Sequence, residues 1–198
     1  LPPVVPSIFR KPIEPKKLLV NIITSDQRIA NRITKTFYWK YPMYKFISFG
    51  DLRNRPREEF AEKLREGAIT IWVDNDTPFG HSAVEAIACD NILIGKVPEM
   101  VPEWMIDEDG GLNDCGIWTY DINVIPDLLA NVVGAWMQDM VPEQLTNAMN
   151  EVNAKYTVDK WEENVDGVMS TIINEQIKSF EQIKNSIKQK ITNETKED

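Results

Sequence analysis

The chain has 198 residues, of which 42% are hydrophobic and 27% are charged. This length predicts one domain or two small ones, and the composition excludes a disordered tail. The longest apolar runs fall far short of the roughly 20 residues that cross a membrane, and we expect no signal peptide. Because the chain begins with Leu1 instead of Met, we expect it to be a fragment of a longer protein.

The distribution of charge is more informative than the net charge of −9. Residues 1–65 contain 14 Lys and Arg against 6 Asp and Glu, a local charge of +8, whereas residues 66–198 contain 8 against 25, a local charge of −17. The acidic part would repel a nucleic-acid backbone, so we expect no nucleic-acid partner. Cys89 and Cys115 form neither a disulfide framework nor a zinc-ligand spacing, which favours a reducing cytoplasm.

In chain order, the sequence predicts a linker followed by alternating strands and helices. Residues 1–17 contain five of the twelve prolines, which predicts irregular structure with a short edge strand near Val4–Phe9. The apolar runs predict strands at 18–23, 45–50, 69–73, 91–95 and 116–120. The patterns between and after them predict helices at 26–40 with Asp26 as N-cap, at 56–66, within 78–89 and at 123–138. This alternation predicts an α/β fold, a Rossmann-like three-layer parallel sheet with helices on both faces.

The last third of the chain has a helical composition. It predicts two helices, near 142–152 and 157–190, so we divide the chain into a Pro-rich interdomain linker (1–17), a Rossmann-like domain (18–140) and C-terminal helices (141–198). One apolar stripe follows the last helix at spacings of three and four, formed by Ile173, Ile177, Phe180, Ile183, Ile187 and Ile191. Two interpretations stay open: the helix packs on its own core or on a copy of itself, or it docks on a part of the protein absent from this chain.

The residues that follow the third predicted strand suit an anionic ligand. In open α/β sheets ligands bind beyond the carboxyl ends of the strands. A Pro-Phe-Gly turn ends at Gly80 and opens a helix whose free N–H groups suit a diphosphate. His81 can add a donor, and Glu85, one turn further, can accept from two ribose hydroxyls. Lys96 is the only Lys or Arg among 13 Asp and Glu over residues 66–138, so it either faces phosphate or is an ordinary surface lysine.

Residues 77–103 (TPFGHSAVEAIACDNILIGKVPEMVPE) resemble the donor-binding half of a retaining glycosyltransferase of the GT-B fold, family 4 type. The family pattern is a Glu, seven residues, a second Glu, an Ala-rich helix, a strand and a loop that ends in Pro-Glu. The resemblance implies that Glu85 holds the nucleotide ribose and that the backbone of Phe79, Gly80 and His81 faces the diphosphate and sugar. The donor-binding loop after the next strand then contains Gly95, Lys96 and Glu99.

The sequence also departs from the family pattern. Thr77 stands where the family has its first Glu, which contacts the donor sugar, and a hydroxyl brings hydrogen bonding without charge. Asp76, one position earlier, is a substitute acceptor that starts from a different place. The family places an Arg and a Lys after the first strand, where this chain has Arg28 and Arg32 in a different local pattern. Arg28 and Lys96 are therefore the candidates for stabilising the leaving diphosphate, and no other catalytic residue is assigned.

The resemblance implies an enzyme, a hexosyltransferase that moves a sugar from a UDP- or GDP-sugar to an acceptor with retention of configuration. The acceptor would bind an N-terminal domain of the same protein, so this chain is expected to be inactive alone. The nucleotide-sugar is a substrate, and neither a cofactor nor a metal is expected. By resemblance, the full-length enzyme would be a bacterial, cytoplasmic protein of polysaccharide biosynthesis, with peripheral contact at the inner face of the membrane left open.

Other functions stay open beside this one. The Thr77 departure is compatible with a non-catalytic nucleotide-binding or scaffolding module of the same fold. The sequence Asp74–Asn75–Asp76 after a strand is also the pattern with which metal-dependent glycosyltransferases hold a divalent cation on the diphosphate. A flavin-binding domain is disfavoured, because the loop after the first strand lacks a run of Ser, Thr or Gly. Dependence of ligand binding on a metal would separate the metal-dependent glycosyltransferase from the GT-B enzyme and from the non-catalytic module.

Overall fold

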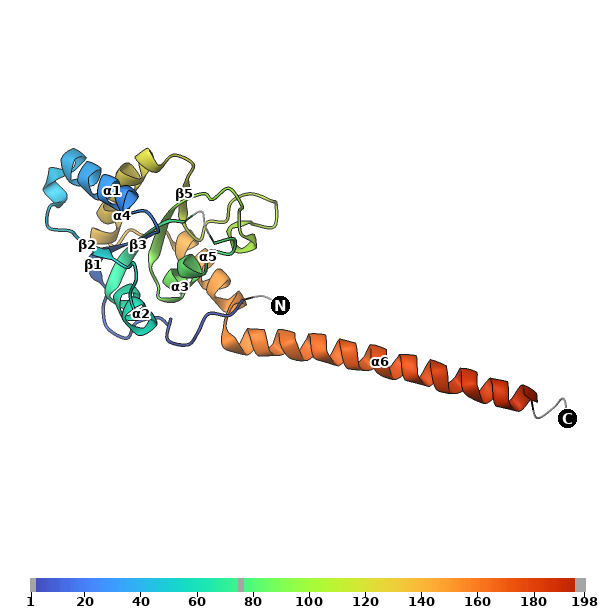
Figure 1. Ribbon diagram of the computed structural model, residues 1–198. Coiled ribbons are helices and arrows are strands. Elements are labelled where there is room, and N and C mark those ends of the chain that lie inside the picture. Colours follow the sequence, from blue (N-terminus) through green and yellow to red (C-terminus); the bar gives the residue numbers. More distant parts are fainter. Residues whose placement is uncertain (1–2, 75–76, 195–198) are drawn as a thin grey trace. The chain divides into compact units, whose positions relative to one another are not determined.

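The computed structural model describes residues 3–74 and 77–194, with side chains up to residue 185. The chain divides into two compact units, one spanning Val4–Thr157 and one containing the long helix from Val158 onward. The first unit contains a parallel β-sheet with helices on both of its faces (Figure 1). The predicted Rossmann-like α/β fold is therefore confirmed.

The sheet has the strand order β2-β1-β3-β4-β5 over the described residues, and every pair of neighbours is parallel. Its strands are β1 (Lys17–Thr24), β2 (Ser48–Asp51), β3 (Gly67–Val73), β4 (Ile92–Lys96) and β5 (Ile117–Thr119). All seven residues of β3 are buried, as expected for a central strand covered on both faces. The order reverses between β1 and β3, so a crevice for a ligand is expected beyond the carboxyl ends of these two strands.

The helices of this unit follow the predicted order. They are α1 (Gln27–Lys40), α2 (Arg57–Glu66), α3 (His81–Ala88), α4 (Ile125–Met137) and α5 (Glu143–Lys155). Asp26 is the N-cap of α1, as predicted: its Oδ1 accepts a hydrogen bond from the Arg28 backbone N–H at 2.8 Å. α1 packs against α4, and α3 packs against α5.

Two predictions about local structure are wrong. The expected edge strand at Val4–Phe9 is an irregular segment whose Val5 and Phe9 side chains are buried, and the Val5 N–H donates to the Tyr156 carbonyl at 2.9 Å. The second strand begins at Ser48 rather than near residue 45, because a short 3₁₀ helix at Pro42–Tyr44 carries the chain over the end of α1. Apolar side chains in both segments reach the core from irregular backbone, which an apolar run alone does not distinguish from a strand.

Asn91 joins two helix ends to the sheet from a fully buried position just before β4. Its Nδ2 donates to the carbonyl oxygens of Leu64 in α2 (2.8 Å) and Ala86 in α3 (3.1 Å). Its Oδ1 accepts from the Thr70 hydroxyl of β3 at 3.0 Å. Carbonyl groups near a helix C-terminus lack intrahelical donors, and the Asn91 side chain supplies a donor to two of them. The Leu64 carbonyl also accepts from Lys16 Nζ at 3.1 Å, and the Ala86 carbonyl also accepts from the Asn91 backbone N–H at 3.0 Å.

The second unit contains α6 (Val158–Glu194), a helix of 37 residues. The predicted stripe lies on it, and the described members Ile173, Ile177, Phe180 and Ile183 are exposed. Ile187 and Ile191 belong to the same predicted stripe, but their side chains lie outside the described residues. Within the described part of the chain, no helix is both long and apolar enough to cross a membrane.

Replacing Asn91 with Ala is expected to lower the free energy of unfolding by about 2–4 kcal/mol, because the buried Thr70 hydroxyl loses its acceptor, two carbonyls each lose one of their donors and the smaller side chain leaves a cavity. Thr70→Val is the matched control, since it removes one of these hydrogen bonds at nearly constant volume and is expected to cost about 1 kcal/mol. Urea unfolding followed by circular dichroism measures both. Equal effects of the two substitutions would show that Asn91 does not support the helix ends.

Candidate functional site

The candidate site lies at the carboxyl edge of the sheet, where the turn after β3 meets the start of α3. Gly80 precedes α3 and has a left-handed conformation, with φ of +69°. A Cβ at this position would stand 2.8 Å from the Trp72 ring and 3.4 Å from the Trp104 ring. Both the backbone conformation and the packed indoles therefore require glycine at position 80. A ligand can approach Gly80 only from the side that the indoles do not cover.

Aromatic contacts hold the turn before α3 in place. The Trp104 Nε1 donates to the Phe79 carbonyl at 2.6 Å. The Phe79 ring packs edge-on against the buried Tyr156 ring, with 5.2 Å between centroids, and lies 4.8 Å from the His81 ring. Because Phe79 is fixed on both sides, the first turn of α3 starts at one defined place. At this start of the helix, the backbone N–H groups of His81 and Ser82 have no carbonyl acceptor within α3.

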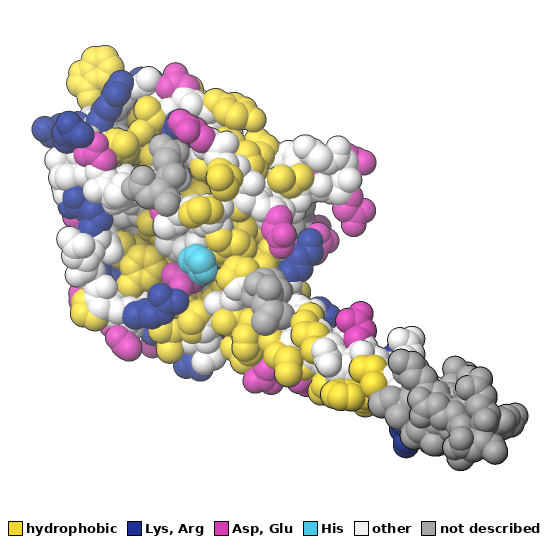
Figure 2. Space-filling model, turned by 45° about the vertical axis from the view of Figure 1, so that its right-hand side comes forward, with side chains coloured by type: hydrophobic (Ala, Val, Ile, Leu, Met, Phe, Trp, Pro, Cys, Tyr) yellow, Lys and Arg dark blue, Asp and Glu magenta, His cyan; other side chains and the backbone are white. Residues whose placement is uncertain are grey.

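His81 is exposed at the helix start. Figure 2 shows this side chain in cyan on the surface, with acidic and basic side chains close to it and hydrophobic ones around it. An exposed imidazole beside free N–H groups at a helix N-terminus can donate to an anion. The structure thus brings together three predicted residues, Phe79, Gly80 and His81, in one turn.

Glu85 lies one turn into α3 and is only 4% exposed. Its Oε1 accepts from the Arg57 guanidinium at 2.5 Å, and the Arg57 side chain is itself 55% exposed. Burial raises the pKa of the Glu85 carboxyl, while the nearby Arg57 charge and hydrogen bond act in the opposite direction. Glu85, the residue predicted to bind the ribose, is therefore a buried carboxylate that pairs with the Arg57 guanidinium in this structure.

Arg57 is a residue that the sequence analysis missed. It is the first residue of α2, and its guanidinium carbon lies 5.1 Å from the centre of the Phe9 ring. α2 starts beyond the carboxyl end of β2, so its first residue belongs to the same edge of the sheet as the start of α3. The sequence signal that could have indicated Arg57 is a Pro-Arg pair at the start of a helix that follows a strand. Many exposed arginines have the same local sequence, so this signal does not distinguish a functional arginine from a surface one.

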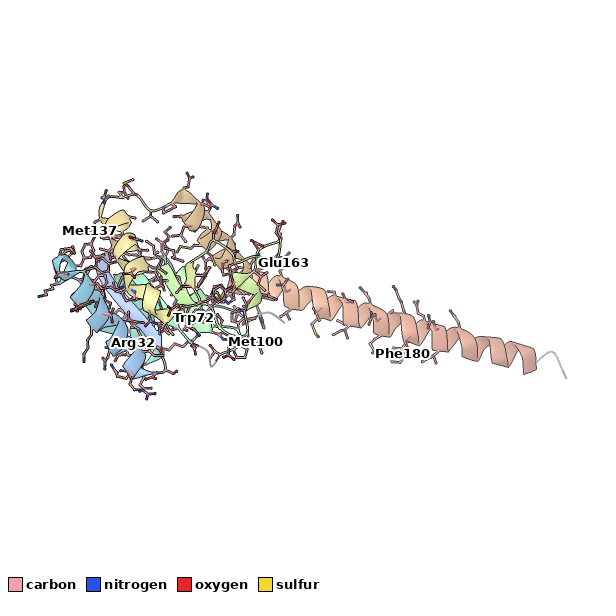
Figure 3. All side chains as sticks on the ribbon, turned by 90° about the horizontal axis from the view of Figure 1, so that it is seen from above. Arg32, Trp72, Met100, Met137, Glu163 and Phe180 are labelled. Atoms are coloured by element: carbon pink, nitrogen blue, oxygen red, sulfur yellow. The ribbon has the colours of Figure 1, made fainter. Side chains whose placement is uncertain are left out.

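Gly95 lies in a row of side chains across three strands. Its register partners are Trp72 in β3 and Trp118 in β5, and a Cβ on Gly95 would stand 2.7 Å from Trp118 and 3.3 Å from Trp72. Packing between the two indoles therefore requires this glycine. Lys96 follows at the end of β4 and is half-buried, and Glu99 is exposed three residues later. Figure 3 shows Trp72 in the interior of this unit.

The structure places two of the predicted residues in local ion pairs or hydrogen bonds. The Thr77 hydroxyl donates to Asp74 Oδ2 at 2.8 Å. The Arg28 guanidinium binds its own N-cap Asp26 at 2.9 Å, and its side chain is 91% exposed. Asn75 and Asp76, which complete the Asp-x-Asp pattern and include the substitute acceptor, lie outside the described residues. Over the part of the chain that is described, no group of three or more His, Cys, Asp or Glu is arranged to hold a metal ion.

Two larger hollows lie away from the predicted residues. One, of about 460 Å³, lies between the 107–114 segment and α5 and is lined by four carboxylates, so it does not suit a diphosphate. The other, of about 450 Å³, lies at the amino end of β1. Its Lys17 and Lys63 both pair with Glu66, at 2.7 and 2.8 Å, and these contacts lower the pKa of Glu66 to about 2. These two lysines are thus already neutralised.

Comparison with solved structures finds similar folds at low sequence identity. The chain is similar to TarM, a GT-B glycosyltransferase, with a TM-score of 0.51 and 14% identity over 82% of this chain and 37% of TarM. It also matches a chain of the GtfA/B complex with a TM-score of 0.49 and 15% identity, over 83% of this chain and 38% of that one. No protein-family model and no curated protein matches the sequence. The likeness to TarM concerns the fold, and this chain spans well under half of that protein.

Gly80→Ala is expected to lower the free energy of unfolding by about 2–4 kcal/mol, the sum of a strained φ and a clash with Trp72. Gly110→Ala is the matched control, since Gly110 has φ of +84° and a Cβ there would meet no atom within 4 Å. It is expected to cost only about 1–2 kcal/mol, the backbone part alone. Chemical unfolding measures both, and equal losses would show that the indoles do not restrict Gly80.

Arg57→Met is expected to make stability depend more steeply on pH. A carboxyl whose pKa is raised in the folded state loses stability as pH rises above its unfolded value of about 4.3. Without Arg57 the pKa of Glu85 rises further, so the variant is expected to be about 1–2 kcal/mol less stable than the wild type at pH 7. This difference should shrink as pH falls through about 4.3, because a Glu85 carboxyl that becomes protonated gains little from the Arg57 charge.

Unfolding by urea between these two pH values measures this effect. The double variant Arg57→Met/Glu85→Gln is the control, because it has no carboxyl at position 85 to titrate. A difference between Arg57→Met and wild type that stays constant across the pH range would show that Arg57 does not act through Glu85.

Proposed function

We propose that this chain is the donor-binding domain of a glycosyltransferase and that it binds a nucleoside diphosphate sugar at the carboxyl edge of its sheet. The observation that carries the proposal is the rigid turn at Phe79–Gly80, which opens α3 with His81 exposed and sets the buried Glu85 one turn behind it. The fold likeness to TarM supports the same assignment. The substrate class follows from the chemistry of this turn together with the resemblance described for residues 77–103.

The diphosphate would lie against the start of α3. Two backbone N–H groups and the positive end of the helix dipole favour a negative group at this place. Lys96 ends β4 at the same edge of the sheet, and it is the only Lys or Arg over residues 66–138. In a strongly acidic part of the chain, one cation beside a helix start gives the diphosphate a specific place to bind.

Glu85 would hold the ribose, and Arg57 would respond to the ligand. The Arg57 side chain is half exposed, so its guanidinium can turn from Glu85 towards a phosphate. The carboxylate is then free to accept hydrogen bonds from two hydroxyls, which keeps the buried charge satisfied in both states. Arg57 is therefore a further candidate, besides Arg28, for stabilising the leaving diphosphate, and in this structure each of the two arginines is paired with a carboxylate.

Transfer itself is proposed for a longer protein. This chain spans 37% of TarM, so an N-terminal acceptor-binding domain, joined through residues 1–17, would complete the reaction cleft. In that protein the groups at the start of α3 would stabilise charge that develops on the diphosphate as the glycosidic bond breaks. Retention of configuration, a UDP- or GDP-linked donor and a cytoplasmic location with a peripheral membrane contact belong to this proposal. No cofactor or metal is part of it.

A non-catalytic module of the same fold is the second candidate, and one observation favours it. The Thr77 hydroxyl, at the position where the family has a sugar-binding Glu, already donates to Asp74. A side chain without charge and with its proton committed locally is a weak ligand for the donor sugar. In this alternative the chain binds nucleotide, or only supports another subunit, and no sugar is transferred.

Calorimetric titration of the chain with UDP, GDP, ADP and their sugar conjugates, with and without Mn²⁺, tests donor binding. We expect saturable binding of one nucleotide without metal, weakened about tenfold (about 1.4 kcal/mol) by Glu85→Gln. Glu151→Gln is the matched control, because Glu151 is an exposed carboxylate on α5. This control should bind like the wild type.

The outcomes separate the candidates. Binding of the free nucleotide with no gain from the attached sugar would favour the non-catalytic module. Binding that requires Mn²⁺ would favour the Asp-x-Asp pattern that begins at Asp74. Absence of binding by every nucleotide would overturn the donor-binding proposal for this chain.

A further inference from the structure

α6 carries a broad apolar face. Its side chains of Met169, Ile172, Ile173, Ile177 and Phe180 are between 47% and 69% exposed. Figure 3 shows Phe180 projecting from the helix. Contiguous exposed apolar surface of this kind marks an interaction site.

The spacing of these residues indicates that another helix covers this face. Apolar residues recur in the sequence with an 11-residue period at offsets of zero, three and seven: Val158, Trp161 and Val165, then Met169 and Ile172, then Phe180, Ile183 and Ile187, then Ile191. Eleven residues make three turns of about 3.67 residues, so such a repeat keeps one seam facing a partner helix along its whole length. Between Val158 and Ile191, Gln176 is the one polar residue at these offsets.

The charge along α6 indicates which helix the partner is. Residues 158–176 contain five Asp and Glu and one Lys, a charge of −4, whereas residues 177–191 contain four Lys and one Glu, a charge of +3. A second copy running in the opposite direction brings the acidic half of each helix against the basic half of the other. A parallel copy would place like charges side by side, which opposes association.

We propose that α6 pairs with α6 of a second copy of this chain as an antiparallel helical dimer, with Gln176 at the twofold axis. In this register position 172 lies opposite position 180, and position 162, a Glu, lies opposite position 190, a Lys. The two Gln176 side chains face each other, and each amide can donate to and accept from the other. A polar residue at one seam position fixes the register of a helix pair, which is the role of Gln176 here.

The size of the contact fits a dimer of moderate affinity. At about 1.5 Å per residue the helix is about 55 Å long, and a seam about 10 Å wide covers on the order of 550 Å² of it. A pair would thus bury on the order of 1,100 Å², near the lower end of the roughly 1,200–2,000 Å² typical of stable interfaces. The dimer is independent of the proposed nucleotide site, because no residue of α6 belongs to that site.

Sedimentation velocity of the whole chain over a range of concentrations tests the association. We expect a reversible dimer, with a dissociation constant raised on the order of a hundredfold or more by Ile172→Glu/Phe180→Glu. Asn174→Glu/Asn185→Glu is the matched control, since it adds the same charge on the opposite side of the helix and should leave the dimer intact. A chain that sediments as a monomer at every concentration overturns the proposal.

Single cysteines in α6 test the direction of pairing. With oxidised glutathione, Gln176→Cys is expected to form a disulfide-linked dimer, because position 176 meets itself across the twofold axis. Met169→Cys should not, because position 169 lies opposite position 183 in the antiparallel pair. Cys89 and Cys115 do not interfere, since burial raises the pKa of both thiols to about 12.

The cross-linking result is decisive even where the charged seam variant loses helical structure. Equal cross-linking of Met169→Cys and Gln176→Cys would indicate a parallel pair and overturn the proposal. Nucleotide binding measured on the same samples separates this inference from the proposed function, since either one can fail while the other holds.

Discussion

The packing of indole rings against glycine backbone is the constraint on which the candidate site depends. Trp72 fills the space beside Gly80 and also meets Gly95, its register partner in the next strand. Trp104 fixes the carbonyl of Phe79 from the other side. Because these rings leave no room for a Cβ at position 80 or 95, the turn that opens α3 and the end of β4 both require glycine.

At the carboxyl edge of the sheet, few cationic side chains are available to pair with carboxylates or with an anionic ligand. A buried carboxylate is unfavourable unless it is paired, and Arg57 supplies the pair for Glu85 from a half-exposed position. An anionic ligand that attracts this guanidinium must leave Glu85 with other donors, and ribose hydroxyls are groups of that kind. In the proposed function, ligand binding and the Arg57–Glu85 ion pair are therefore linked through one side chain.

The apolar side chains of α6 are packed differently from those of the sheet unit. The strands and α1–α5 bury their apolar faces on one another, whereas the apolar face of α6 is exposed from Met169 to Ile183. A long helix gains most of its stability in water from packing rather than from propensity. Its periodic seam and its two oppositely charged halves therefore indicate a surface made for a partner, and the second copy is the partner whose charges match it.

The sequence by itself determined the order and type of the elements, the Rossmann-like fold, the Asp26 cap and the turn that opens α3, because each depends on neighbouring residues and a local hydrophobic period. It did not determine that Val5 and Phe9 are buried without forming a strand, since that depends on contacts far along the chain. Only the tertiary structure decided that Arg57, 28 residues before Glu85, is its partner, and that indoles from β3 and β5 require Gly95. The physical reason is that ion pairs and packing depend on distance in space, which local patterns do not encode.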